Sequence, residues 1–200
     1  MTNIIIQISK YIIILLMAAY TFSCFSIFTR NYEDEEKRVL IRQDVLLFLL
    51  QMVSFFAMYT AKKDLRILFI YAALAVVILG VILLYNLIYP SVSRLVVNNM
   101  CMLITIGFIM LTRISYDQSM KQFKILAIAT VVALIVPILI KKLKFLDKLG
   151  YLYALGGIGL LGVVLVFAKF SYGSKLSISI GGFTFQPSEF VKIIFVFAAA

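Results

Sequence analysis

The sequence predicts an all-α polytopic integral membrane protein, and three observations lead to that prediction. Hydrophobic residues make up 64% of the 200-residue chain, and its mean hydropathy is +1.08. Because a soluble domain of this size cannot hide so much apolar surface, lipid is the expected solvent. Short charged segments also separate long apolar runs, and tyrosines gather near the ends of those runs, as they do at membrane interfaces.

The apolar runs predict about six complete spans and the start of a seventh, since each span needs about 20 apolar residues. The predicted spans are Tyr11–Phe28, Val45–Ala61, Ile67–Tyr89, Leu95–Leu111, Phe123–Ile140 and Tyr151–Ala168, and the seventh begins at Phe190. The predicted linkers are Arg30–Asp44, Lys62–Arg66, Pro90–Arg94, Arg113–Gln122 and Lys141–Lys148. Within the first linker, the charged run 33–38 is interpreted as a solvated loop.

The first span has a second interpretation as a signal peptide. Lys10 precedes its apolar stretch, and Ser23-Cys24 follows it. The apolar run continues to Phe28, however, and the cysteine lacks the neighbours that a lipoprotein cleavage site prefers. We therefore expect a retained span.

The segment between the sixth span and the seventh alternates with a period of two. Leu176, Ile178 and Ile180 alternate with serines, and after Gly181-Gly182 two phenylalanines flank Thr184. This pattern predicts a small β-hairpin at the membrane surface.

The charge and the residue inventory exclude several classes of function. The net charge of +10 comes from 19 basic and 9 acidic residues, but the basic residues lie mainly between apolar runs, which indicates membrane-flanking charge and no nucleic-acid partner. The chain has no His, and Cys24 and Cys101 lie within apolar runs without a metal-binding or disulfide spacing. No metal site and no cofactor are evident.

Polar or small residues inside the spans are interpreted as packing features. Asn98 and Asn99 lie within an apolar run and are expected to form interhelical hydrogen bonds. Gly156, Gly157, Gly159 and Gly162 fall in one span, where small residues let helices approach closely.

The strongest functional candidate is the motif at residues 186–192, directly before the last apolar run. Pro187 suits the first position of a helix, which makes Gln186 the N-cap and puts Glu189 near the positive end of the helix dipole. Glu189 and Lys192 are spaced to share a helix face. A structural pair there would contribute about 0.3–1 kcal/mol. The alternative is that Gln186, Ser188, Glu189 and Lys192 form the wall of a polar cavity that holds pyrophosphate or sugar. The cost of an unpaired ammonium in a membrane favours a partner or a cavity over exposure to lipid.

The string Gln-Pro-Ser-Glu-Phe-Val-Lys at 186–192 resembles the SEDS family, which comprises FtsW, RodA and SpoVE. The segment Ile106–Arg113 is similar to the end of that family's usual first span, and the resemblance covers roughly Leu95–Ala200. It divides the chain into extra N-terminal spans at 1–94 and the N-terminal part of a SEDS helical bundle at 95–200. The Arg-Trp pair usual in the loop before the motif is absent.

The resemblance implies a peptidoglycan glycosyltransferase that polymerises lipid II, the undecaprenyl-linked precursor, at the bacterial cytoplasmic membrane. It implies a class B penicillin-binding protein and other divisome or elongasome membrane proteins as partners, with membrane lipid around them. Division, elongation and sporulation are equally compatible with the sequence. The family's catalytic carboxylate lies beyond this motif, so the catalytic residue is expected beyond residue 200 and the chain alone is expected to be inactive. A divalent cation is allowed for the full-length enzyme.

Two other functions are compatible with the same residues. A transporter that flips the lipid-linked precursor needs charged groups through the membrane depth, of which this chain offers few. A non-catalytic scaffold of the cell-wall machinery needs none, and the extra spans would serve for docking. Basic residues are balanced between the two sides, so the orientation with 141–148 in the cytoplasm rests on the density of that cluster.

Overall fold

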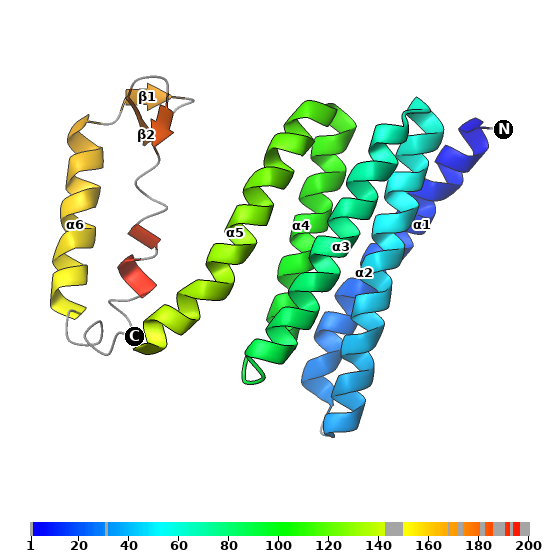
Figure 1. Ribbon diagram of the computed structural model, residues 1–200, viewed down its shortest axis with the longest axis horizontal. Helices are drawn as coiled ribbons and strands as arrows, with labels where there is room; N and C mark the ends of the chain where they lie inside the picture. The colour runs from blue at the N-terminus through cyan, green and yellow to red at the C-terminus, as the bar shows by residue number, and fades with distance from the viewer. Residues whose placement is uncertain are drawn as a thin grey trace. The chain divides into compact units, whose positions relative to one another are not determined.

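A computed structural model describes residues 2–30, 32–142, 150–167, 169–171, 174–180, 183–185, 191–192 and 194–196. The chain forms two compact units, Met1–Leu134 and Ile135–Ala200. The helices of the first unit are α1 (Thr2–Ser26), η1 (Ile27–Thr29), α2 (Glu33–Lys62), α3 (Leu65–Ile88), α4 (Arg94–Ile114) and most of α5 (Tyr116–Lys142). The second unit contains α6 (Gly150–Phe167) and the strands β1 (Lys169–Ser171), β2 (Ser174–Ile180) and β3 (Phe183–Phe185). Figure 1 shows these elements in chain order.

The helices confirm the predicted polytopic class. Among the described residues, α1 to α5 are long and apolar enough to cross a membrane. The sixth predicted span corresponds to α6, whose 18 residues are near the minimum for a crossing. Of the predicted seventh span, residues 191–192 and 194–196 are described, and they are helical.

The interpretation of the charged run 33–38 as a loop is wrong, because α2 begins at Glu33 and runs to Lys62 without a break. Four acidic residues in succession, at positions 33–36, lie at the positive end of the helix dipole, where carboxylates are stabilising. Arg30 adds an exposed ion pair with Glu35 at 3.2 Å. The linker predicted at 113–122 is also too long, because Ser115 alone separates α4 from α5.

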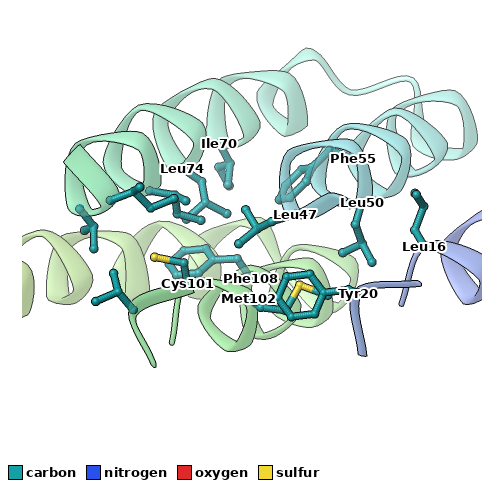
Figure 2. Packing of buried hydrophobic residues seen from close by; sticks show 14 of the residues in the cluster. Leu16, Tyr20, Leu47, Leu50, Phe55, Ile70, Leu74, Cys101, Met102 and Phe108 are labelled. Carbon is teal, nitrogen blue, oxygen red and sulfur yellow. The ribbon is translucent and has the colours of Figure 1, made fainter. Parts of the chain in front are cut away.

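The core of the first unit is one cluster of side chains from α1 to α4. Leu47, Phe55 and Leu74 are fully buried, and Tyr20 and Phe108 pack into the same cluster (Figure 2). The opposite helix faces stay apolar but exposed, with Phe22, Leu87 and Leu103 among the examples. Such faces suit a lipid solvent, so each helix buries one stripe against protein and presents the other to the bilayer.

The first helix is part of this bundle, which supports a retained span. Leu16 and Tyr20 of α1 are buried in the shared core (Figure 2). The Tyr20 hydroxyl also donates to Asn99 Oδ1 of α4 at 3.1 Å. Loss of α1 would expose both the core and this polar contact.

Pro137 lies inside α5, and the structure compensates for the hydrogen bond that it removes. Proline has no N–H, so the carbonyl of Ala133, four residues earlier, loses its helical donor. The Tyr85 hydroxyl of α3 donates to Ala133 O at 3.4 Å, and the Tyr89 hydroxyl donates to Leu134 O at 2.6 Å. A neighbouring helix thus satisfies the freed backbone, as a membrane interior requires.

The predicted β-hairpin is confirmed, and it belongs to a slightly larger sheet. Strands β2 and β3 pair antiparallel in the register Ile178–Phe185, Ser179–Thr184 and Ile180–Phe183. β1 pairs antiparallel with the other edge of β2, which gives the order β1-β2-β3. The sheet lies in the chain between α6 and the motif at 186–192.

Replacement of Tyr85 by Phe should cost about 0.5–1.5 kcal/mol of stability, the usual value of one hydrogen bond. In a Pro137→Ala background the cost should fall towards zero, because the alanine N–H can then bond to Ala133 O. Thermal unfolding in one detergent measures the stability of the unchanged protein, the two single variants and the double variant. Equal costs in both backgrounds would show that the tyrosine does not replace the missing helical bond.

Candidate functional site

Of the predicted site residues, the structure describes Lys192. Gln186, Ser188 and Glu189 lie outside the described residues. Lys192 is helical and exposed, and it follows Val191 at the start of the last helical segment. The predicted pairing of Glu189 with Lys192 stays a prediction.

An apolar groove lies within the second unit, and sequence neighbours of Lys192 line it. Its volume is about 360 Å³, and α6 forms one side through Tyr153, Gly157 and Leu161. Val191, Ile194 and Phe195 form the other side. The helical segment that carries Lys192 therefore also presents an apolar face to α6.

Gly157 lies on the face of α6 that packs against Ile194. A Cβ atom added at Gly157 would lie 3.5 Å from Ile194 Cγ2, which is ordinary packing distance. At Gly156, Gly159 and Gly162 an added Cβ would meet nothing within 4 Å among the described residues. The predicted close packing is therefore seen near Gly157 and stays a prediction at the other three glycines.

A second polar group, which the sequence analysis missed as a site, joins α2 to α4 in the first unit. Arg94 Nη2 donates to Asp44 Oδ2, and the two side chains are 29% and 17% exposed. Asp44 Oδ1 and Arg94 Nε are buried without a partner among the described residues. Burial strengthens an ion pair and also makes its loss costly, because one partner alone becomes an uncompensated charge.

Asn98 extends this contact one helical turn further along α4. Its Nδ2 lies 3.4 Å from both Leu40 O and Gln43 Oε1 of α2. Asn98 and Gln43 are completely buried. The prediction of interhelical hydrogen bonding by Asn98 is confirmed.

Asn99 faces α1 instead and accepts two hydrogen bonds from it. Its Oδ1 accepts from the Tyr20 hydroxyl at 3.1 Å and from Cys24 Sγ at 3.2 Å. Cys24 Sγ in turn accepts from Gln43 Nε2 at 3.6 Å. Adjacent asparagines on α4 thus bind two different helices, and α1, α2 and α4 share one polar network.

We refer to Asp44, Arg94, Gln43, Asn98 and Asn99 as the polar junction. The amides of Gln43 and Asn98 at its centre have no access to solvent, and the described residues contain no cluster of three His, Cys, Asp or Glu side chains to hold a metal ion. The hydrogen bonds of these amides join α2 to α4 and fix their relative position. Asn98 Oδ1, like Asp44 Oδ1 and Arg94 Nε, is buried without a partner among the described residues. In the sequence, Asp44 and Arg94 each border a predicted span and carry opposite charges, which is a signal for an ion pair between those spans. Both residues fall in predicted linkers, however.

The opposite end of α4 is also fastened to α2. Lys62 Nζ donates to Arg113 O at 2.8 Å and lies 3.5 Å from Thr112 O. These carbonyls belong to the last turn of α4, where a cation is favourable. The Thr112 and Ser119 hydroxyls, 2.8 Å apart, then connect α4 to α5.

The helices and their buried polar contacts define a multi-pass membrane protein. A family model described as a cell cycle protein, FtsW/RodA/SpoVE, matches residues 93–200, more than half of the chain. The chain therefore belongs to the FtsW/RodA/SpoVE family, as its motif predicted. Neither the curated proteins nor the solved structures contain a match to it.

The Asp44–Arg94 pair should show strong coupling in a double-mutant cycle. Asp44→Asn and Arg94→Met should each cost about 1–3 kcal/mol, because each leaves a buried polar partner unsatisfied. The double variant should cost clearly less than the sum of the two. Unfolding in mixed micelles measures these values, with Leu103→Ala on the exposed face of α4 as the control. Additive costs would contradict the pairing.

Proposed function

We propose that this chain serves in a peptidoglycan glycosyltransferase of the bacterial cytoplasmic membrane, in which its family region binds lipid II. Membership of a cell cycle family supports the setting. The motif at 186–192 supplies the polar groups, and the role of each residue in binding is part of the proposal. A class B penicillin-binding protein is the proposed partner.

The observation that carries the proposal is that the segment with Lys192 also contributes to an apolar groove. Lipid II consists of a long hydrocarbon chain, a pyrophosphate and a disaccharide with a peptide. A site for it must combine an apolar surface with cations at the level of the pyrophosphate. Val191 and Ile194, which flank Lys192 in the sequence, line the groove, and Lys192 itself is exposed.

Two described carboxylates lie on the same side of the membrane in the orientation that we propose, and both are at helix starts. Asp64 Oδ1 accepts from Arg66 N at 2.9 Å and caps α3. Asp117 lies in the first turn of α5, near the positive end of that helix. We keep the expectation, which the family resemblance supports, that the chain alone does not polymerise lipid II.

Capture of a photoreactive lipid II analogue by the chain in nanodiscs tests the proposal. Lys192→Met should weaken capture about 10- to 100-fold, which is the usual value of a charged hydrogen bond. Glu189→Ala should also weaken it, and the double variant should lose less than the two effects combined. Lys124→Met, which removes a cation from α5, is the matched control.

Equal capture by the Lys192 and Lys124 variants would contradict the proposed site. A parallel reaction with labelled lipid II and the penicillin-binding protein tests the catalytic expectation. Glycan above the partner-only control would place the catalytic group within this chain, with Glu189 as the first residue to examine.

The proposed orientation puts the α2–α3 turn outside the cell and the α3–α4 turn in the cytoplasm. Lys63 lies in the first turn and Ser91 in the second. In a variant without Cys24 and Cys101, a cysteine at position 63 should react with an impermeant thiol reagent on intact cells, and one at position 91 should react after lysis. The reverse pattern would invert the orientation.

A further inference from the structure

A second groove lies in the first unit. It has a volume of about 520 Å³ and runs between α1, α2 and α4. Ile13 and Met17 line it from α1, Leu50 and Met58 from α2, and Ile109 from α4. Figure 2 shows Leu50 of α2 on the side of the core that faces Leu16 of α1. Most of the lining is hydrocarbon, so an apolar chain fits it.

Three cations are part of the lining of this groove. They are Lys10 of α1, Lys62 of α2 and Arg113 of α4. None of the three pairs with a carboxylate within the described part of the chain. Lys62 Nζ donates to two carbonyls of α4, which satisfy hydrogen bonds but do not neutralise its charge. The groove is therefore lined by three positive charges from three helices, and Lys62 and Arg113 lie at the same end of the bundle.

The charge around the three cations is also positive. Lys63 and Arg66 lie at the same end of the bundle, in and after the α2–α3 turn. The acidic residues there are Asp64 and Asp117, and Asp64 already caps α3. The net positive charge therefore attracts anions to this end of the bundle.

The length of the groove and its charge suit a lipid. From Leu50 to Lys62, α2 rises about 18 Å, close to half of the roughly 30 Å hydrocarbon thickness of a bilayer. The groove is therefore long enough for an acyl chain in one leaflet, and its three cations favour an anionic head group.

We propose that this groove binds an anionic phospholipid, with its phosphate among Lys10, Lys62 and Arg113 and one acyl chain along α2. The site belongs largely to the helices before residue 93, and it does not depend on lipid II binding. The lipid would fill the gap between α1 and α4 and neutralise the cations there. Bound lipid should therefore stabilise the first unit.

Titration of the 200-residue chain in a neutral detergent with phosphatidylglycerol or phosphatidylcholine tests the proposal. Native mass spectrometry counts the bound lipid, and thermal unfolding reports stabilisation. Phosphatidylglycerol should bind more tightly and raise the melting temperature more than phosphatidylcholine. Lys10→Met should weaken phosphatidylglycerol binding about fivefold, the value expected for one cation beside an anionic lipid.

The variants separate lipid binding from folding. Lys62→Met also removes the cap on α4, whereas Lys10 has no such contact in the described structure, so Lys10→Met is the principal test. Lys63→Met removes a neighbouring charge outside the groove lining and is the matched control. Equal binding of the two lipids, or equal losses for Lys10→Met and Lys63→Met, would overturn the proposal.

A photocrosslinking residue at Met110, which lines the groove and is 54% exposed, identifies the occupant in native membranes. An adduct with the mass of a phospholipid supports the proposal. An adduct with another protein would replace the lipid with a partner helix and overturn it.

Discussion

The position of α4 depends on a polar contact with α2 whose loss would leave unpaired polar groups in the membrane interior. Lipid offers no hydrogen bonds, so Asp44, Arg94 and Asn98 must find partners within the protein or remain unsatisfied. Each finds one partner across the α2–α4 interface, while Asp44 Oδ1, Arg94 Nε and Asn98 Oδ1 have none among the described residues. Asn99 binds α1. Apolar packing between membrane helices has little directional preference, because lipid tails are as apolar as leucine. The polar junction supplies the missing specificity and sets which faces of α1, α2 and α4 meet.

This contact has a consequence for the organisation of the chain. The family match begins at residue 93, directly before α4. The partners of α4 in the polar junction lie on α1 and α2, outside the matched region. The helices before residue 93 are therefore packed against the first family helix and do not form a separate bundle within the first unit. The lipid groove that we propose uses the same three helices, and its cations Lys62 and Arg113 lie at the end opposite to the polar junction.

Much of the fold could be predicted from hydropathy alone, because lipid selects long apolar helices. The hairpin could also be predicted, since alternation of apolar and polar residues on both sides of Gly181-Gly182 is typical of two paired strands. The extent of α2 could not be predicted that way, because a charged helix end outside the bilayer has the hydropathy of a loop. The asparagines of α4 were correctly interpreted, but their partners were not identified. Pairing across helices depends on rotation about each helix axis, which a run of apolar residues specifies only weakly.

The site could be predicted less completely than the fold. The motif directed attention to Lys192, and the structure adds the groove that its sequence neighbours line. No sequence pattern indicated that groove, because one side comes from α6 and the other from Val191, Ile194 and Phe195. Asp44 and Arg94 were assigned to linkers, since each borders an apolar run and neither forms part of a recognisable motif. Only the parallel arrangement of α2 and α4 brings them together.

The most direct test of this account is to express residues 1–92 and 93–200 as two chains in the same cells. The break falls in the turn before α4, so the polar junction and the apolar core would be what connects the halves. The account predicts that the halves copurify in mild detergent and that Asp44→Asn combined with Asn98→Leu abolishes copurification, whereas Leu103→Ala does not. Halves that never associate, or that associate equally well without the polar junction, would contradict it.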